Sequence, residues 1–161
     1  MRQVVLDELR ARYGFGCGYC GVTEADIGAK LTTDHFLPRS RGGSDDPDNL
    51  VYCCFACNTY KGDFWSADPN ERLLHPLVDD VSAHFTQSPN GKLMELTASG
   101  RLHIANLQLN RPELMAYRLA RQTQREVTET LRDSLNELES LRQRVAELEA
   151  AVAAAERRFR P

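Results

Sequence analysis

The first residues of the chain alternate between apolar and charged side chains with the period of a helix. Two glycines, Gly14 and Gly16, follow directly and should end that helix, so we expect a short helix over residues 2–12. No part of the chain is apolar enough for a signal peptide or a membrane span, so we expect a cytoplasmic protein. The apolar positions of this first pattern are Val4, Val5, Leu9 and Tyr13.

Short β-branched segments come next and predict strands. The first is "KLTTD" at residues 30–34 and the second is "NLVYC" at residues 49–53, with a loop rich in Gly, Pro and Asp between them. A short helix is expected from Phe55 to about Phe64. Residues 66–111 mix Pro, Asn and Gly with small apolar groups, and only "GKLMELT" at 91–97 predicts another strand.

A single long helix is predicted from Pro112, because proline suits the first helical position and nothing breaks the pattern before Pro161. Such a helix is about 70 Å long at about 1.5 Å per residue. Its apolar residues follow steps of four and three, and two successive steps of three, from Leu135 to Leu141, predict a stammer that overwinds a coiled coil. The stripe consists of Val127, Leu131, Leu135, Leu138, Leu141, Val145, Leu148, Val152, Ala155 and Phe159.

Two interpretations of this stripe are open. The helix either folds back on its own domain or associates with another helix, in a homo-oligomer, most simply a dimer, or in a partner protein. We favour self-association because a chain of 161 residues has too little other surface to cover the stripe. The predicted organisation is a core over residues 1–65, an accessory packing extension over 66–111 and the long helix over 112–161.

Composition limits the size of the hydrophobic core and bears on whether the protein binds nucleic acid. With 42% hydrophobic residues, the chain can bury one modest core plus an appendage. The net charge of −3 lacks the basic excess that is frequent in nucleic-acid-binding proteins. However, arginines far outnumber lysines, and arginine is the better bidentate ligand for phosphate.

Four of the five cysteines form two Cys-x-x-Cys pairs. Cys17 and Cys20 lie in "CGYC", and Cys54 and Cys57 lie in "CFAC". Two such pairs supply the four thiolates that tetrahedral zinc prefers, and because no position stays open for water, the predicted zinc is structural. Cys53 is assigned to the core of the second strand, although a Cys53-x-x-x-Cys57 pair is a conceivable alternative.

The segment between and around these pairs, "LTTDHFLPRSRGGSDDPDNLVYCCFACNTYKGD" at residues 31–63, resembles the HNH endonuclease family. The resemblance implies an α+β fold with a small ββα-metal core, here stapled by zinc and followed by a long C-terminal coiled-coil helix. It also implies a site made of Asp34, His35, Asn49 and Asn58. In this site Asn58 takes the position of the second histidine of the His-Asn-His pattern. Residues 83–118 resemble an extension found after this core in some bacterial and phage members, and we expect them to pack against the zinc finger.

The residue types at these positions suit hydrolysis of DNA phosphodiester bonds. Histidine has an unperturbed pKa of about 6.5 and is suited to be the general base, so His35 receives that role. The oxygens of Asp34 and Asn58 suit a catalytic Mg²⁺ or Mn²⁺ ion. By resemblance, Asn49 bonds across the loop or to the His35 carbonyl and orients the imidazole. Phosphate contacts are expected from Arg39, Arg41 and Lys61, and His75, His84 and His103 are expected to be ordinary core or surface residues.

Two other functions are compatible with the sequence. One is a zinc-finger module that binds nucleic acid or acts as an adaptor without cutting, but such a module has no use for a general base. The other is a nuclease subunit of a larger defence or packaging complex, held there by residues 112–161. No base-reading motif is recognisable, so sequence specificity is not predicted.

Overall fold

The computed structural model describes residues 3–68 and 70–158, which fall into two compact units, Met1–Arg118 and Leu119–Pro161. Phe159, the last residue of the predicted stripe, and Pro161, its predicted end, lie outside the described residues, as do the side chains of Val4 and Val5. The first unit runs through both predicted divisions, at residues 65 and 111, so those boundaries stay predictions.

The first unit begins with the predicted helix, α1 (Gln3–Arg12). A second helix, α2 (Glu24–Ile27), was not predicted. Its Thr23 hydroxyl accepts a hydrogen bond from the Asp26 amide at 3.2 Å, and the Asp26 carboxylate accepts one from the Thr23 amide at 2.8 Å. This reciprocal capping stabilises a helix of only one turn.

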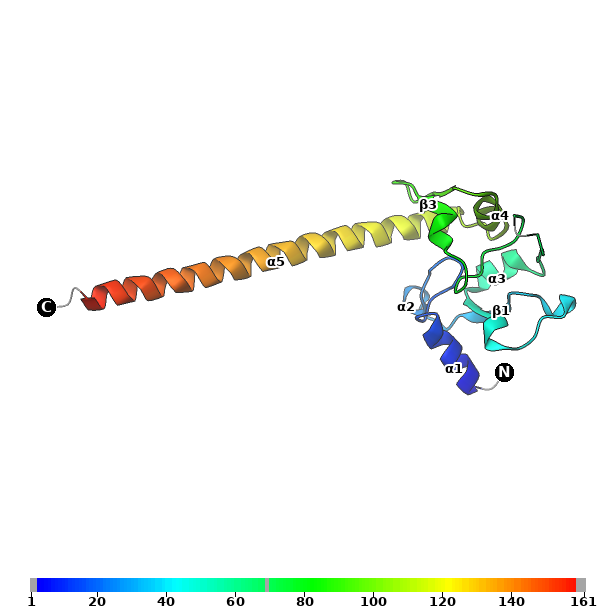
Figure 1. Ribbon diagram of the computed structural model, residues 1–161, viewed down its shortest axis with the longest axis horizontal. Helices are drawn as coiled ribbons and strands as arrows, with labels where there is room; N and C mark the ends of the chain where they lie inside the picture. Colours follow the sequence, from blue (N-terminus) through cyan, green and yellow to red (C-terminus); the bar gives the residue numbers. More distant parts are fainter. Residues whose placement is uncertain (1–2, 69, 159–161) are drawn as a thin grey trace. The chain divides into compact units, whose positions relative to one another are not determined.

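The predicted strand pair is present as an antiparallel hairpin. Strand β1 (Thr32–His35) pairs with β2 (Leu50–Cys53), with Thr32 opposite Cys53 and His35 opposite Leu50. Two 3₁₀ turns, η1 (Arg39–Arg41) and η2 (Pro47–Asn49), shape the long loop between the strands. Helix α3 (Phe55–Lys61) follows at once and packs against β1, which completes a ββα unit (Figure 1).

The remainder of the first unit is more regular than the sequence predicted. After η3 (Val81–Ala83), strands β3 (Phe85–Gln87) and β4 (Leu93–Glu95) form a second hairpin, and α4 (Ala98–Asn106) follows. Only β4 was predicted. Gly100 lets α4 approach the second hairpin, since a Cβ there would lie 2.0 Å from the carbonyl oxygen of His84.

The hydrophobic core of the first unit joins the ββα unit to the residues after it. Cys17 and Tyr19 of the first cysteine pair, together with Val51 of β2, belong to the same buried cluster as side chains from the later segment. This supports the expectation that the extension packs against the finger. The later members of the cluster are Leu73, Leu93, Ile104, Leu107, Leu109 and Leu114.

The long predicted helix is present as α5 (Pro112–Arg158). Its first turns belong to the first unit, where Leu114 is buried and the Tyr117 hydroxyl lies 2.8 Å from the Asp26 carboxylate. The predicted stammer needs correction, because two steps of four, from Val127 to Leu135, precede the two steps of three. The four steps together span two heptads, so the frame is restored. Among the described residues, no helix is long and apolar enough to span a membrane.

Candidate functional site

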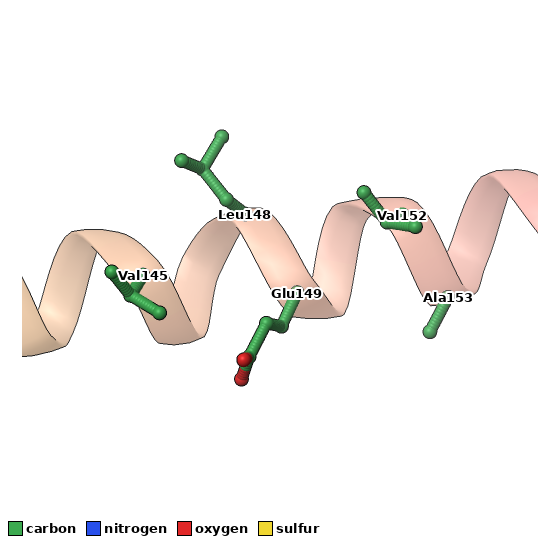
Figure 2. A pocket seen from close by; sticks show the side chains of 5 residues that line it. All are labelled: Val145, Leu148, Glu149, Val152 and Ala153. Carbon is green, nitrogen blue, oxygen red and sulfur yellow. The ribbon is translucent and has the colours of Figure 1, made fainter.

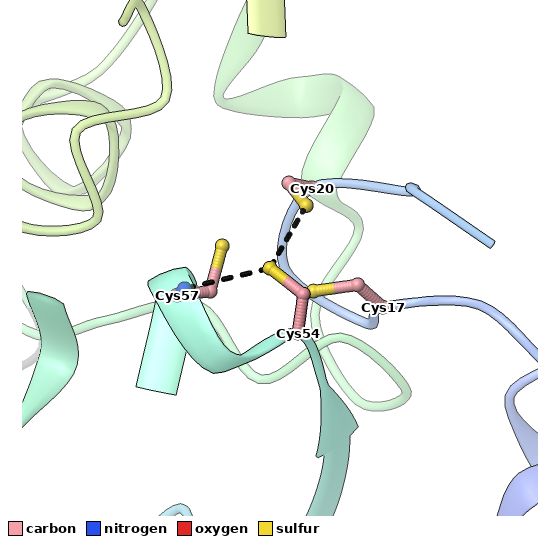
Figure 3. A group of neighbouring side chains, drawn as sticks. All are labelled: Cys17, Cys20, Cys54 and Cys57. Atoms are coloured by element: carbon pink, nitrogen blue, oxygen red, sulfur yellow. Dashed lines mark hydrogen bonds between the residues drawn. The ribbon is translucent and has the colours of Figure 1, made fainter. Parts of the chain in front are cut away.

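The four paired cysteines converge on one point. Cys17 and Cys20 lie in the turn after α1, and Cys54 and Cys57 lie at the start of α3 (Figure 3). Their Sγ atoms all lie within 4.8 Å of one another, and those of Cys20 and Cys54 are 3.7 Å apart. Tetrahedral zinc, with Zn–S bonds of about 2.3 Å, places its sulfurs about 3.8 Å apart, so the cluster fits this ion.

A backbone donor and neighbouring thiols favour the thiolate form of one of these sulfurs, that of Cys54. Cys54 is the N-cap of α3, and its Sγ accepts a hydrogen bond from the Cys57 amide at 3.5 Å. Hydrogen bonds from neighbouring thiols, from Cys17 above all, lower the pKa of Cys54. Arg111 Nη2 lies 4.0 Å from Cys57 Sγ. Because all four ligand positions come from cysteine, a metal bound here would be structural.

Cys53 takes no part in this cluster. It lies on β2 opposite Thr32 and is completely buried in the core. Burial raises the pKa of its thiol, which keeps the sulfur protonated and apolar in character. The core position expected for Cys53 is therefore observed, and among the described residues the metal-binding group contains the two Cys-x-x-Cys pairs and not the alternative pair.

Asp34, a residue of β1, is buried, with 6% of its surface exposed. The Tyr19 hydroxyl donates to its carboxylate at 2.6 Å, and the Lys61 ammonium lies 3.0 Å from the same oxygen. Burial raises the pKa of Asp34, and the hydrogen bond from Tyr19 and the charge of Lys61 oppose that rise. The carboxylate already has an internal cation beside it.

Lys61 lies in the interior of the first unit and not at the surface, where a residue that contacts phosphate is expected. Its side chain is completely buried, and besides Asp34 its ammonium donates to the carbonyl oxygen of His35 at 2.8 Å. The reason is that the last turn of α3 packs on β1, so a residue there points into the hairpin. Asn58 lies three residues earlier on α3, on the same helix face. The structure therefore places the Lys61 ammonium beside Asp34, inside the hairpin.

His35 has different surroundings from its neighbour in sequence. A quarter of its side chain is exposed, and it lines a pocket of about 200 Å³ with Thr33, Arg39, Asp45 and Leu50. Its Nε2 lies 2.7 Å from the Asp45 carboxylate, which also accepts a hydrogen bond from Arg39 Nε at 3.1 Å. The hydrogen bonds from His35 and from Arg39 lower the pKa of Asp45.

An ionised carboxylate can only accept hydrogen bonds. Asp45 therefore selects the tautomer in which His35 Nε2 carries the hydrogen and Nδ1 carries the lone pair. Asp45 was missed at the sequence level, since nothing in "GGSDDPDN" distinguishes it from the aspartates beside it. Tyr19, inside the first cysteine pair, was missed in the same way.

Asn49 binds the loop that carries this arrangement. Its Oδ1 accepts a hydrogen bond from the Leu37 amide at 2.8 Å, and its Nδ2 donates to the carbonyl oxygens of Leu37 at 3.1 Å and Ser44 at 2.8 Å. Of its two expected partners, the loop is the one observed, and the His35 carbonyl accepts a hydrogen bond from Lys61 instead. Gly43 is required beside it, since a Cβ there would lie 1.8 Å from the Leu37 carbonyl oxygen.

The predicted site is thus divided into two groups. One contains Asp34 and Lys61, with Asn58 on the same face of α3, and the other contains His35 with residues of the loop. Adjacent residues of a strand point to opposite faces, which accounts for the separate partners of Asp34 and His35. Arg41 is exposed at the end of η1, and its contact with phosphate stays a prediction.

The other three histidines lie apart from these groups. His103 is buried, and its Nδ1 accepts a hydrogen bond from the Leu74 amide at 3.2 Å. His84 Nδ1 is 2.7 Å from the Thr97 hydroxyl. His75 packs edge-on against Phe36. Unlike an ordinary core histidine, it has a buried Nε2 without a hydrogen-bond partner within residues 3–68 and 70–158.

Comparison with known families supports the assignment. The HNH endonuclease family model matches residues 17–64, a range that includes both cysteine pairs, the β1–β2 hairpin and α3. The chain therefore carries an HNH endonuclease domain over these residues, with a four-cysteine metal site. Comparisons with curated proteins and with solved structures found no match.

Proposed function

We propose that this protein is a metal-dependent endonuclease that hydrolyses DNA phosphodiester bonds with His35 as the general base. The observation that carries the proposal is the pair formed by His35 and Asp45, 2.7 Å apart at a partly exposed pocket inside the HNH domain. A histidine that is held by a carboxylate and reachable from solvent is equipped to move a proton.

In this proposal, His35 Nδ1 takes a proton from the attacking water. Asp45 holds the ring through Nε2 and stabilises the imidazolium that forms, which it can do because its lowered pKa keeps it ionised. Asn49 keeps the loop in place through its three hydrogen bonds to Leu37 and Ser44. It acts on the base only through the backbone, as a positioning residue.

The residues that would hold a catalytic Mg²⁺ or Mn²⁺ are Asp34 and Asn58, whose carboxylate and amide oxygens are hard ligands. When bound, such an ion neutralises the charge that develops on the phosphate and on the leaving oxygen. The Lys61 ammonium lies 3.0 Å from Asp34, so an ion at this carboxylate has to displace it. We therefore propose that Lys61 stands in for the metal until substrate and metal bind.

The exposed arginines of η1 supply the contact with the nucleic acid. Arg39 and Arg41 lie on the loop beside His35, and Arg39 already shares the carboxylate of Asp45 with it. We propose DNA as the nucleic acid, the reducing cytoplasm as the compartment because the zinc site needs free thiols, and association of the protein through α5. Association with a second copy and association with a larger complex are both compatible with this function.

A plasmid-nicking assay tests the proposal. His35→Ala should lower cleavage by roughly 10²- to 10⁴-fold while zinc content and DNA binding persist. Asp34→Ala should recover part of its activity at high manganese, whereas His35→Ala should not. His84→Ala, a histidine outside the HNH domain, is the matched control and should cut like the wild type. Equal nicking by His35→Ala and the wild type would show that this histidine is not the base.

One observation favours a second candidate, a zinc finger that binds nucleic acid or acts as an adaptor without cutting. The carboxylate of Asp34 is buried and already neutralised by Lys61, as it would be in a finger that has no need of a catalytic ion. If the folded, zinc-loaded wild type retains DNA in a mobility-shift assay but nicks no DNA form with magnesium or manganese, this candidate replaces the nuclease.

A further inference from the structure

The second unit exposes almost all of its large apolar side chains. Eight of them on α5 keep between 46% and 65% of their surface accessible, which is far more than a folded chain leaves in a continuous stripe. Within the described part of α5, nothing from the chain covers them. The eight residues are Val127, Leu131, Leu135, Leu138, Leu141, Val145, Leu148 and Val152.

Seven of these eight residues follow one heptad frame, and Leu135 lies one position after Ser134, which occupies the core position at that point. Leu131, Leu138, Val145 and Val152 lie seven residues apart and occupy the first core position of each heptad, called a. Val127, Ser134, Leu141, Leu148 and Ala155 lie seven apart and occupy the second core position, called d. The valines at a and the leucines at d in the C-terminal heptads are the combination that favours two parallel strands.

Charged residues flank this core in a self-complementary order. The positions called g and e border the core, and in a parallel in-register pair each g residue lies beside the e residue five positions later on the other helix. Glu137 and Arg144 are at g, and Arg142 and Glu149 are at e. Glu137 of one copy therefore meets Arg142 of the other, and Arg144 meets Glu149. By symmetry each contact occurs twice.

The same charges oppose a slipped pair. If one helix moves by a single heptad, one Glu137 meets Glu149 and one Arg144 meets Arg142, so two of the four attractive contacts become repulsive. Of the other two, Glu137 meets Leu135, and only the contact of Arg144 with Glu156 is still attractive. The sequence thus rewards one register and penalises the next, which is how coiled coils select their partners.

The surface of α5 also has a depression at a position where a side chain of a second helix would pack. Val145, Leu148, Glu149 and Val152 line a depression of about 370 Å³ together with Ala153 (Figure 2). The first four occupy positions a, d, e and the next a, which form the four-residue hole that receives a d-position knob in a parallel pair. In register, that knob is the second copy's Leu148.

We infer that two copies of this chain pair through α5 as a parallel, in-register, two-stranded coiled coil. The inference does not depend on the proposed nuclease activity. Because α5 starts inside the first unit, a parallel pair joins two HNH domains to the same end of the coiled coil. Two nuclease sites would then act from one end of one particle, an arrangement suited to cutting both strands of a duplex.

Charge reversal in the full-length protein tests both the pairing and its direction. Arg142→Glu should weaken the dimer by roughly tenfold or more at low salt, because two attractive contacts become repulsive. Adding Glu137→Arg should restore wild-type affinity, since these two residues meet only in the parallel in-register pair. The measurement is sedimentation equilibrium over a concentration series, repeated at high salt, where the differences should shrink.

Arg132→Glu is the matched control. Arg132 follows a glutamate by three residues, as Arg142 does, but it lies on the outer face of the frame, so its reversal should leave the dimer unchanged. Antiparallel helices pair e with e, so rescue of Arg142→Glu by Glu149→Arg instead of Glu137→Arg would overturn the parallel arrangement. A wild type that stays monomeric at micromolar concentration, or that forms trimers, would overturn the pairing itself.

Discussion

Leu114 and Leu119 lie five residues apart on the same helix, yet the first is 3% exposed and the second is 38% exposed. The boundary between the two units runs between them. On one side, Leu114 belongs to a buried cluster with side chains from distant parts of the first unit, and on the other, eight large apolar side chains keep between 46% and 65% of their surface exposed. The comparison teaches that the apolar residues of the first unit are buried within that unit, whereas those of the second stay exposed, as our proposed pairing through α5 requires.

The largest expected effect comes from breaking the first unit at its metal. Cys54→Ser removes one zinc ligand and the N-cap of α3, so the first unit should unfold while the helix of the second unit persists. Elemental analysis should find about one zinc per chain in the wild type, and circular dichroism should retain a helical signal in the variant. Cys53→Ser is the control, and it should keep its zinc. A folded wild type without zinc would contradict the assignment.

A smaller effect is expected at the buried ion pair of the first unit. Lys61→Met leaves Asp34 buried without its cation, which should lower the free energy of unfolding by roughly 3–5 kcal/mol. If a divalent ion can take the place of the ammonium, manganese should restore much of that stability, and far more than it adds to the wild type. Thermal unfolding with and without manganese measures this, with the exposed Lys92→Met as control. Equal responses to manganese would argue against an ion at Asp34.

The acid sensitivity of the first unit should depend in part on His103. Burial lowers the pKa of His103 to about 4, so the folded state resists a proton that the unfolded state binds below about pH 6.5. Stability is therefore lost as the pH falls through this range, by about 2 kcal/mol between pH 7 and pH 5.

His103→Gln keeps an acceptor for the Leu74 amide but has no proton to bind, so it should lose that much less stability over the same interval. The comparison is the free energy of unfolding by denaturant at the two pH values, for the wild type and the variant. Because both proteins share the zinc site and all the carboxylates, an identical loss in both would show that His103 does not carry the effect.

The smallest effect should follow from removing the second unit. A chain that ends at Gln122, one turn beyond Arg118, keeps the hydrogen bonds from Arg118 Nε to the Gly91 carbonyl at 2.6 Å and from Arg118 Nη2 to the Leu109 carbonyl at 2.7 Å. The first unit should then keep its stability within about 0.5 kcal/mol, and light scattering should report a monomer. A large loss of stability would mean that the first unit is not complete.

The sequence revealed the features of this protein that depend on short spacing. The two Cys-x-x-Cys pairs, the Asp34–His35 step, the β-branched strands and the uninterrupted pattern after Pro112 each lie within a window where the period or motif is visible. All of these predicted elements are present, with small shifts at their ends. They positioned the HNH domain and the long helix correctly.

What the sequence did not reveal depends on contacts between distant residues. Lys61 was predicted to contact phosphate, because the packing of α3 on β1 that buries it cannot be seen in the sequence. The His35 carbonyl that it binds lies 26 residues away. Asp45 stands out only once the loop brings it to His35. Helix α4 lacks an amphipathic pattern, since Gly100 and His103 are buried in it, and so its sequence does not resemble that of a surface helix.

The order of the cysteines along the chain also has a consequence for synthesis. Both strands of the hairpin, with Asp34, His35 and Asn49, lie between the two cysteine pairs, so the metal can close the finger only after Cys57 has left the ribosome. The pairing stripe of α5 starts 70 residues later, at Val127. During translation the finger can therefore mature before the stripe appears, and two chains that meet through α5 would bring together domains that are already folded.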